Sequence, residues 1–161
     1  MPEQKTNVMR VLDQKKIKYS AHEYPHGDTA VDGVTVAAMT GRDPGQVFKT
    51  LVAKGAKGGI YVFVIPVDMS LELKKAAKAV GEKSVSMVAV SELLGLTGYV
   101  RGGCSPIGMK KRYVTVFHDS ILQRETVLVS AGRIGSQVEL QPADLIRLTA
   151  GKTADIAAKE E

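Results

Sequence analysis

The sequence contains no tryptophan, and its aromatic residues make up only 5% of 161 residues. Its apolar residues, 44% of the chain, are therefore mainly aliphatic, and we expect a core of Val, Leu, Ile, Ala and Met. A chain of this length is about the size of one domain and can bury a sizeable core without disulfides or metals. We predict a single domain over residues 1–161.

Cysteine is also scarce, since Cys104 is the only one. One thiol cannot form an internal disulfide or complete a cysteine-rich zinc site. A chain with a single cysteine therefore favours a reducing compartment. The polar segment 1–10 lacks the apolar stretch of a signal peptide. The longest apolar run, 60–65, is far too short to span a bilayer. We therefore expect a cytoplasmic protein with no membrane partner.

Acidic residues are outnumbered, with 17 Asp and Glu against 22 Lys and Arg, which gives a formal net charge of +5. This excess favours polyanionic partners such as nucleic acid, but only mildly, because many basic proteins bind none. The three histidines and the scattered carboxylates show no metal-ligand spacing. We predict neither a metal nor another cofactor.

Strands and helices alternate without a regular rhythm. Apolar and β-branched segments predict strands at 17–24, 51–54, 60–67, 84–89, 113–117, 126–130 and 138–140. Helical spacing predicts helices at 5–16, 35–40, 71–80, 91–94 and 143–148. The order favours a mixed α/β (α+β) fold, with a barrel-like mixed sheet of six or seven strands and surrounding helices, over a doubly wound parallel sheet.

Two segments carry helix-start signals. Asp43-Pro44-Gly45-Gln46 has a capping residue, a proline suited to the first helical position and a glutamine that completes a capping box. Ser70 is expected to cap the helix that Gly81 ends.

Lys49 is unusual because it lies between apolar residues, in Val47-Phe48-Lys49-Thr50-Leu51, at a predicted helix–strand junction. Such a lysine can reach into a cleft and hold a phosphate, a ribose oxygen or a developing oxyanion. It can equally extend from a strand edge into solvent. Position alone leaves both interpretations open.

The glycine-rich loop Gly102-Gly103-Cys104-Ser105-Pro106 predicts close backbone approach. Its main-chain N–H groups could bind an ester carbonyl or a phosphate, or the loop could be a tight structural turn. It fits neither a P-loop nor a dinucleotide fingerprint. Lys110, Lys111 and Arg112 follow it, either adding positive charge beside the loop or lying on a solvated surface.

No side chain stands out as a nucleophile. Cys104 could pair with one of the three histidines, but no nearby motif supports this. Ser105 and Ser130 lack the pattern of a nucleophile elbow. Ser130, at a strand end before small residues, could place its hydroxyl in a pocket or bond its own backbone.

Several segments together resemble the YbaK/EbsC family of free-standing Cys-tRNA(Pro) deacylases, which is related to the editing domain of bacterial prolyl-tRNA synthetases. The resemblance runs from about Tyr19 to Ile156. It is carried by residues 48–51, 73–78, 97–99, 102–112 and 129–132. The glycine-rich loop followed by Lys-Lys-Arg is the most specific of these segments.

The resemblance implies an editing-domain-like mixed α/β fold and an enzyme that hydrolyses, in trans, the ester between an amino acid and the tRNA 3′ end. In this family the thiol of the substrate's own cysteine attacks the neighbouring ester carbonyl. The pocket would then orient the ester and stabilise the oxyanion. The implied partners are charged tRNA, chiefly tRNA(Pro), and transiently prolyl-tRNA synthetase, with no DNA and no cofactor.

The predicted site residues follow from this resemblance. Those assigned to catalysis are Lys49, Gly102 and Gly103. Those assigned to substrate binding are Tyr24, Phe48, Ser105, Pro106 and Ser130. Those assigned to tRNA binding are Lys74, Lys110, Lys111 and Arg112.

Two departures from the family pattern bear on the pocket. A family member carries an aromatic residue near the position of Asp32, whereas this chain has none between Tyr24 and Phe48, which bears on substrate choice. Cys104 stands where a relative can have an aliphatic residue, and we interpret it as a small filler of the loop.

Two alternatives remain open at this stage. The substrate could be another mischarged tRNA, such as Ala-tRNA(Pro), which has no thiol and would need a bound water. The chain could also be a non-catalytic tRNA- or synthetase-binding module, which the basic residues Lys74, Lys75 and Lys110 to Arg112 would support.

Overall fold

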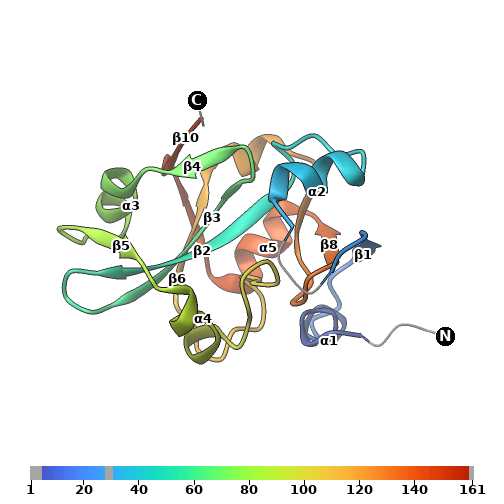
Figure 1. Cartoon of the computed structure of the whole chain (residues 1–161), viewed down its shortest axis with the longest axis horizontal. Helices are drawn as coiled ribbons and strands as arrows, with labels where there is room; N and C mark the ends of the chain where they lie inside the picture. The colour runs from blue at the N-terminus through green and yellow to red at the C-terminus, as the bar shows by residue number, and fades with distance from the viewer. Residues whose placement is uncertain (1–4, 28–30, 160–161) are drawn as a thin grey trace.

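The computed structural model describes residues 5–27 and 31–159, which form ten strands and five α-helices (Figure 1). The helices are α1 (Asn7–Gln14), α2 (Gly33–Met39), α3 (Leu73–Val80), α4 (Val90–Thr97) and α5 (Pro142–Thr149). The strands are β1 (Tyr19–Glu23), β2 (Phe48–Gly55), β3 (Ile60–Pro66), β4 (Met69–Leu71), β5 (Val85–Met87), β6 (Val114–His118), β7 (Val127–Ser130), β8 (Ser136–Leu140), β9 (Lys152–Ala154) and β10 (Ala157–Lys159). A 3₁₀ helix, η1 (Asp119–Gln123), follows β6.

The central sheet has five strands in the order β5-β2-β3-β6-β9. β2 pairs antiparallel with β3, whereas β3 pairs parallel with β6 and β6 with β9. The predicted mixed sheet is therefore confirmed. β3 is the apolar strand expected to be central, and Val62 to Pro66 are all buried because both faces of this strand are covered.

The described strands form three sheets, and the prediction of one sheet with six or seven strands was wrong in that respect. β1, β8 and β7 form a second, antiparallel sheet, and β10 pairs with β4. An isolated parallel bridge from Val47 to Leu128 joins the second sheet to the start of β2. There the N–H of Leu128 donates to the carbonyl of Gln46 at 3.1 Å.

The central sheet separates two parts of the core. Val62 and Val64 face one side, where α1 and α5 contribute Val8, Leu12 and Leu145. Phe63 and Ile65 face the other side, where α3 contributes Ala76 and Ala77. This period-two alternation is what a strand buried on both faces requires. The core is largely aliphatic, as the composition predicted.

Two predicted helix starts were wrong. Asp43 does not begin a helix, because its side chain accepts from the N–H of Gly45 at 3.0 Å and its carbonyl accepts from Gln46 at 2.8 Å. These bonds close a turn that leads straight into β2. Ser70 lies inside β4, and α3 begins after Glu72, whose side chain makes no cap hydrogen bond. The predicted helix end is confirmed, since Gly81 is left-handed with φ +74°.

Figure 1 shows α1 and β1 at one end of the molecule and α3 and β5 at the other. α2 lies above the start of β2, near the second sheet (Figure 1). None of the helices in the described ranges is long and apolar enough to cross a membrane.

Candidate active site

A cleft of about 900 Å³ opens where the central sheet, the second sheet and α2 meet. The start of β2 contributes Phe48 to Leu51, and the second sheet contributes Ser130 and Gln137. Asp32, Gly33 and Val36 form the α2 wall, and the lining also includes Val100, Arg101, Gly102 and Cys104. The cleft therefore collects segments from four distant parts of the chain.

The sheet junction sets the register of this cleft. Val47 bridges Leu128 in parallel. Two residues further along each of these two segments lie Lys49 and Ser130. Ser130 in turn pairs with Gln137 on β8. These residues therefore follow one another across the floor of the cleft because the two sheets meet at a single bridge.

Helix α2 is held on this junction by a small apolar cluster of Ala37, Val47, Val67 and Leu128. A Cβ atom at Gly33 would lie 2.6 Å from Cγ1 of Val67, so only glycine lets α2 approach this closely. Near Asp32 the cleft is lined by small aliphatic side chains and by Asp32 itself, and no aromatic residue lies between Tyr24 and Phe48.

Lys49 is the second residue of β2 and lies opposite Ile65 of β3. It is half-buried and lines the cleft. Phe48 beside it is 3% exposed and belongs to the core, so the backbone that carries Lys49 is fixed by packing. A lysine held this way places a cation beside whatever the cleft binds.

The glycine-rich loop forms a turn in which the N–H of Gly103 donates to the carbonyl of Val100 at 3.0 Å. Gly102 has φ +86°, which fits the third position of a type II turn. Gly102 lines the cleft. Gly103 is buried behind it, and a Cβ there would lie 3.0 Å from the Cα of Arg133. Of the two glycines that we predicted as catalytic, Gly102 therefore lines the cleft and Gly103 does not.

Ser105 and Pro106 are not among the residues that line the cleft. Ser105 is fully buried, and its Oγ accepts from the N–H of Ile107 at 3.3 Å. Pro106 lines a separate hollow of about 200 Å³ together with Lys111 and Arg112. Both residues are buried and lie outside the cleft lining, and their contact with substrate stays a prediction.

Tyr24 and Ser130, which we predicted to bind substrate, both lie in the cleft lining. Tyr24 is 8% exposed, so its ring is fixed. Ser130 Oγ accepts from the N–H of Gly132 at 3.1 Å. Ser130 therefore bonds its own backbone and also lines the cleft. The two interpretations of its sequence context, a turn residue and a pocket residue, are compatible.

The predicted tRNA-binding residues lie outside the cleft. Lys74 is exposed on α3, and the Lys110 side chain lies against Gly98. Lys111 and Arg112 line the smaller hollow. The cation that joins Lys49 in the cleft is Arg101, which we did not predict although it precedes the glycine-rich loop directly.

Cys104 lines the cleft but is only 7% exposed. Burial raises the pKa of its thiol from 9.0 to about 12, against a small lowering by a hydrogen bond from Thr97. The thiol is therefore protonated at neutral pH and is a poor nucleophile.

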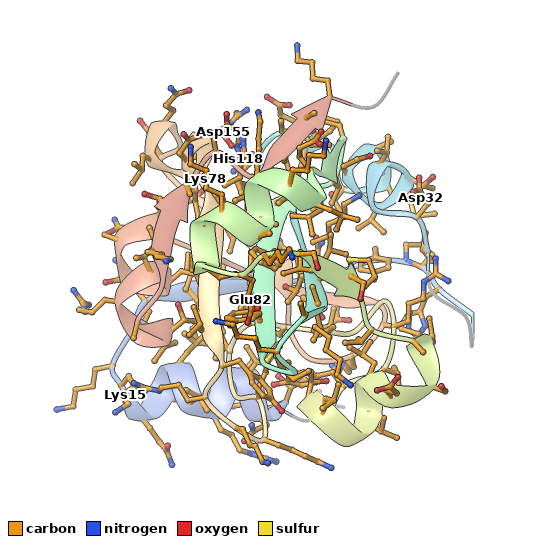
Figure 2. All side chains as sticks on the ribbon, turned by 90° about the vertical axis from the view of Figure 1, so that its left-hand side faces the viewer. Lys15, Asp32, Lys78, Glu82, His118 and Asp155 are labelled. Atoms are coloured by element: carbon orange, nitrogen blue, oxygen red, sulfur yellow. The ribbon has the colours of Figure 1, made fainter. Side chains whose placement is uncertain are left out.

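No histidine is placed to activate it. His22 contacts Glu139 at 2.9 Å, His118 contacts Ser120 at 2.9 Å, and His26 contacts the carbonyl of Gly27 at 2.8 Å. All three lie in the described ranges, and none lines the cleft. Figure 2 shows His118 and Asp155 well apart from Asp32, which marks the α2 wall. Within the described chain no cluster of His, Cys, Asp or Glu could hold a metal ion.

Two further polar residues of the lining, Thr50 and Gln137, were not assigned to the site from the sequence. Thr50 follows Lys49, and Gln137 precedes the strand predicted at 138–140, which in fact begins at Ser136. A polar residue at the edge of an apolar strand was the available signal. The cleft thus offers cations, a shaped backbone turn and neutral polar groups, which suits binding and orienting a charged ester rather than nucleophilic attack by the protein.

Comparison with known proteins gives consistent matches. Residues 27–148 match the family model for the aminoacyl-tRNA editing domain. EbsC of Enterococcus faecalis (strain ATCC 700802 / V583), named as a Cys-tRNA(Pro)/Cys-tRNA(Cys) deacylase, is 44% identical over 158 residues, or 98% of this chain and 96% of that protein.

Solved structures agree with this match. A crystal structure named as a trans-editing enzyme for prolyl-tRNA synthetase is 26% identical with a TM-score of 0.79, covering 97% of this chain and 99% of that one. The hypothetical protein APE2540 is 25% identical with a TM-score of 0.86, covering 95% of this chain and all of that one.

Proposed function

This chain belongs to the aminoacyl-tRNA editing domain family, and from that membership we propose that it is a trans-editing deacylase that hydrolyses the ester of mischarged Cys-tRNA(Pro). The observation that carries the proposal is the meeting of Lys49, Gly102, Tyr24 and Ser130 in one cleft. The name of the Enterococcus faecalis relative supports cysteine as the amino acid.

In this proposal the substrate supplies its own nucleophile. The cysteinyl sulfur attacks the carbonyl carbon of its own ester, so that a carbon–sulfur bond forms and the carbon–oxygen bond to the ribose breaks. The thiol proton passes to the departing ribose oxygen, and water then opens the cyclic thioester. The high pKa of Cys104 supports this route, since a protonated, buried thiol cannot replace the thiol of the substrate.

The protein's share is orientation and charge stabilisation. The Lys49 ammonium would stabilise the negative charge that develops on the carbonyl oxygen, or hold the phosphate of the terminal nucleotide. The turn at Gly102 would bring main-chain donors to the same oxygen. Arg101, exposed at the cleft, would meet the phosphates of the tRNA end.

Recognition of tRNA(Pro) in this proposal depends on a partner as well as on this chain. Prolyl-tRNA synthetase would deliver the mischarged tRNA during a transient association in the cytoplasm. Lys74, Lys110, Lys111 and Arg112 would contact the tRNA outside the cleft.

The test is hydrolysis of a panel of charged tRNAs that contains Cys-, Ala- and Ser-tRNA. We expect Cys-tRNA(Pro) to be hydrolysed fastest, and Lys49→Ala to lower kcat/KM by about 100-fold or more. Lys54→Ala, an exposed lysine in the same strand, is the matched control and should retain activity. Cys104→Ala should stay within a few-fold of the unchanged protein.

Each other outcome points elsewhere. Equal activity on Cys-, Ser- and Ala-tRNA would replace the substrate thiol with a bound water as the nucleophile. Loss of activity in a folded Cys104→Ala variant would make that thiol the nucleophile. Salt-sensitive tRNA binding without turnover would identify a non-catalytic binding module.

A further inference from the structure

Two residues of the cleft lining carry a side-chain oxygen with unused hydrogen-bonding capacity. Within the described chain, Thr50 Oγ1 and Gln137 Oε1 are buried and have no hydrogen-bond partner. Gln137 is only 7% exposed, and both residues line the cleft. Because an unpaired buried polar group is costly, these atoms are expected to meet a ligand's hydrogen-bond donors.

The neighbour of Gln137 on the same face of β8 shows the contrast. Glu139 accepts from Thr126 Oγ1 at 2.6 Å and contacts His22 at 2.9 Å and Arg42 at 3.0 Å. Two residues earlier in β8, on the same face, Oε1 of Gln137 has no such partner. Of these two neighbours, Gln137 is the one that lines the cleft and carries the unpaired oxygen.

The chemistry of the bound ester selects the group that these atoms would meet. In the proposed function the aminoacyl group, as the terminus of the tRNA, would reach the buried part of the cleft, while the phosphates would stay near exposed Arg101. An ester carbonyl only accepts hydrogen bonds, and a thiol is a weak donor. Within the cysteinyl group itself, the one strong donor is the α-amino group.

On the premise of the proposed function, we propose that Gln137 Oε1 and Thr50 Oγ1 accept hydrogen bonds from the α-amino group of the bound aminoacyl ester. The pair would thereby select tRNAs whose amino acid has a free amine. An N-acylated chain, as in peptidyl-tRNA, offers a single N–H at that position and cannot satisfy two acceptors. The site would spare such tRNAs.

The test uses ligands that cannot turn over. We compare the cysteinyl amide of 3′-amino-3′-deoxyadenosine with the matching 3-mercaptopropionyl amide, which lacks only the α-amine. The unchanged protein should bind the cysteinyl amide about tenfold more tightly, by NMR titration at pH 7. Gln137→Leu should bring the two dissociation constants within about twofold, because it removes the acceptor at similar volume.

Gln137→Glu is the matched control, since it retains an acceptor at the same place and should keep the preference. If Gln137→Leu does not fold, Thr50→Val carries the same test, with a reduced preference expected. A full preference in the folded Gln137→Leu variant, or no preference in the unchanged protein, overturns the inference. The deacylation of Cys-tRNA by the unchanged protein is measured separately, so failure of the proposed function remains distinguishable.

Discussion

Gly102 and Gly103 are adjacent copies of one amino acid with different physical requirements. Gly102 needs glycine for its conformation, because φ +86° is unfavourable for other residues. Gly103 needs glycine for space, because the backbone of Arg133 and Ile134 lies 3.0–3.2 Å from where its Cβ would be. The first faces the cleft, and the second fixes the loop against the turn that follows β7.

Gly102→Ala should therefore reduce both stability and activity. The strained turn costs about 1–2 kcal/mol in the free energy of unfolding, and its displacement from the cleft lowers deacylation by about tenfold or more. Gly58→Ala is the matched control, because Gly58 has φ +91° and open space around it in the β2–β3 turn. Urea unfolding should show similar losses for both variants, and activity should fall in Gly102→Ala alone. Equal activities would remove Gly102 from the site.

At this scale, the resemblance predicted the residues whose side chains or backbone face the cleft directly, such as Lys49, Tyr24 and Ser130. It did not predict that Ser105 points into the protein, because the path of a loop depends on contacts with residues far along the chain. Gln137 was missed because an unfilled acceptor is visible only when every neighbour is known.

At the scale of elements, Glu139 connects three of them. Its carboxylate on β8 contacts His22 of β1, Arg42 after α2 and Thr126 before β7. Burial opposes ionisation, but the hydrogen bonds from Thr126 and His22 and the charge of Arg42 outweigh it and lower the pKa of Glu139. The carboxylate thus holds the end of α2, a cleft wall, onto the second sheet.

Glu139→Gln should destabilise the protein by about 1–3 kcal/mol at pH 7. A folded-state pKa below the unfolded one gives stability that is present above the unfolded value, near 4.5, and is lost as the pH falls through the folded value. The difference between Glu139→Gln and the unchanged protein should therefore shrink below about pH 4.5. Glu125→Gln, an exposed carboxyl nearby, should show no such difference in urea unfolding. A pH-independent difference would contradict the network.

Elements with a strong local signal were predicted, and those created by pairing were not. The apolar run of β3 identifies it without any partner. β4, β9 and β10 have three residues each and exist because a neighbouring strand lies beside them. The turn at Asp43 has residue types that are typical of a helix start, but β2 begins too soon after it for a helix to form.

At the scale of the whole molecule, the cleft forms where the two larger sheets meet, and no local pattern marks that junction. The glycine-rich loop closes over the core beneath it through Tyr99, whose hydroxyl donates to the carbonyl of Ile107. Tyr99 and Cys104 belong to the same buried cluster. The stability of the whole fold should therefore respond to the ionisation of these two groups.

Burial raises the pKa of Tyr99 from 10.0 and of Cys104 from 9.0, each to about 12. A folded-state pKa above the unfolded one gives stability that is complete below the unfolded value and is lost as the pH rises toward the folded value. Unfolding should therefore become easier from about pH 9 upward, by a total on the order of 5 kcal/mol. The free energy of unfolding can be measured by urea unfolding followed by circular dichroism between pH 8 and 12, relative to its value at pH 7. It should fall less in Cys104→Ala, because this variant lacks the group that begins to titrate first. An unchanged alkaline profile in that variant would show that the buried thiol does not contribute.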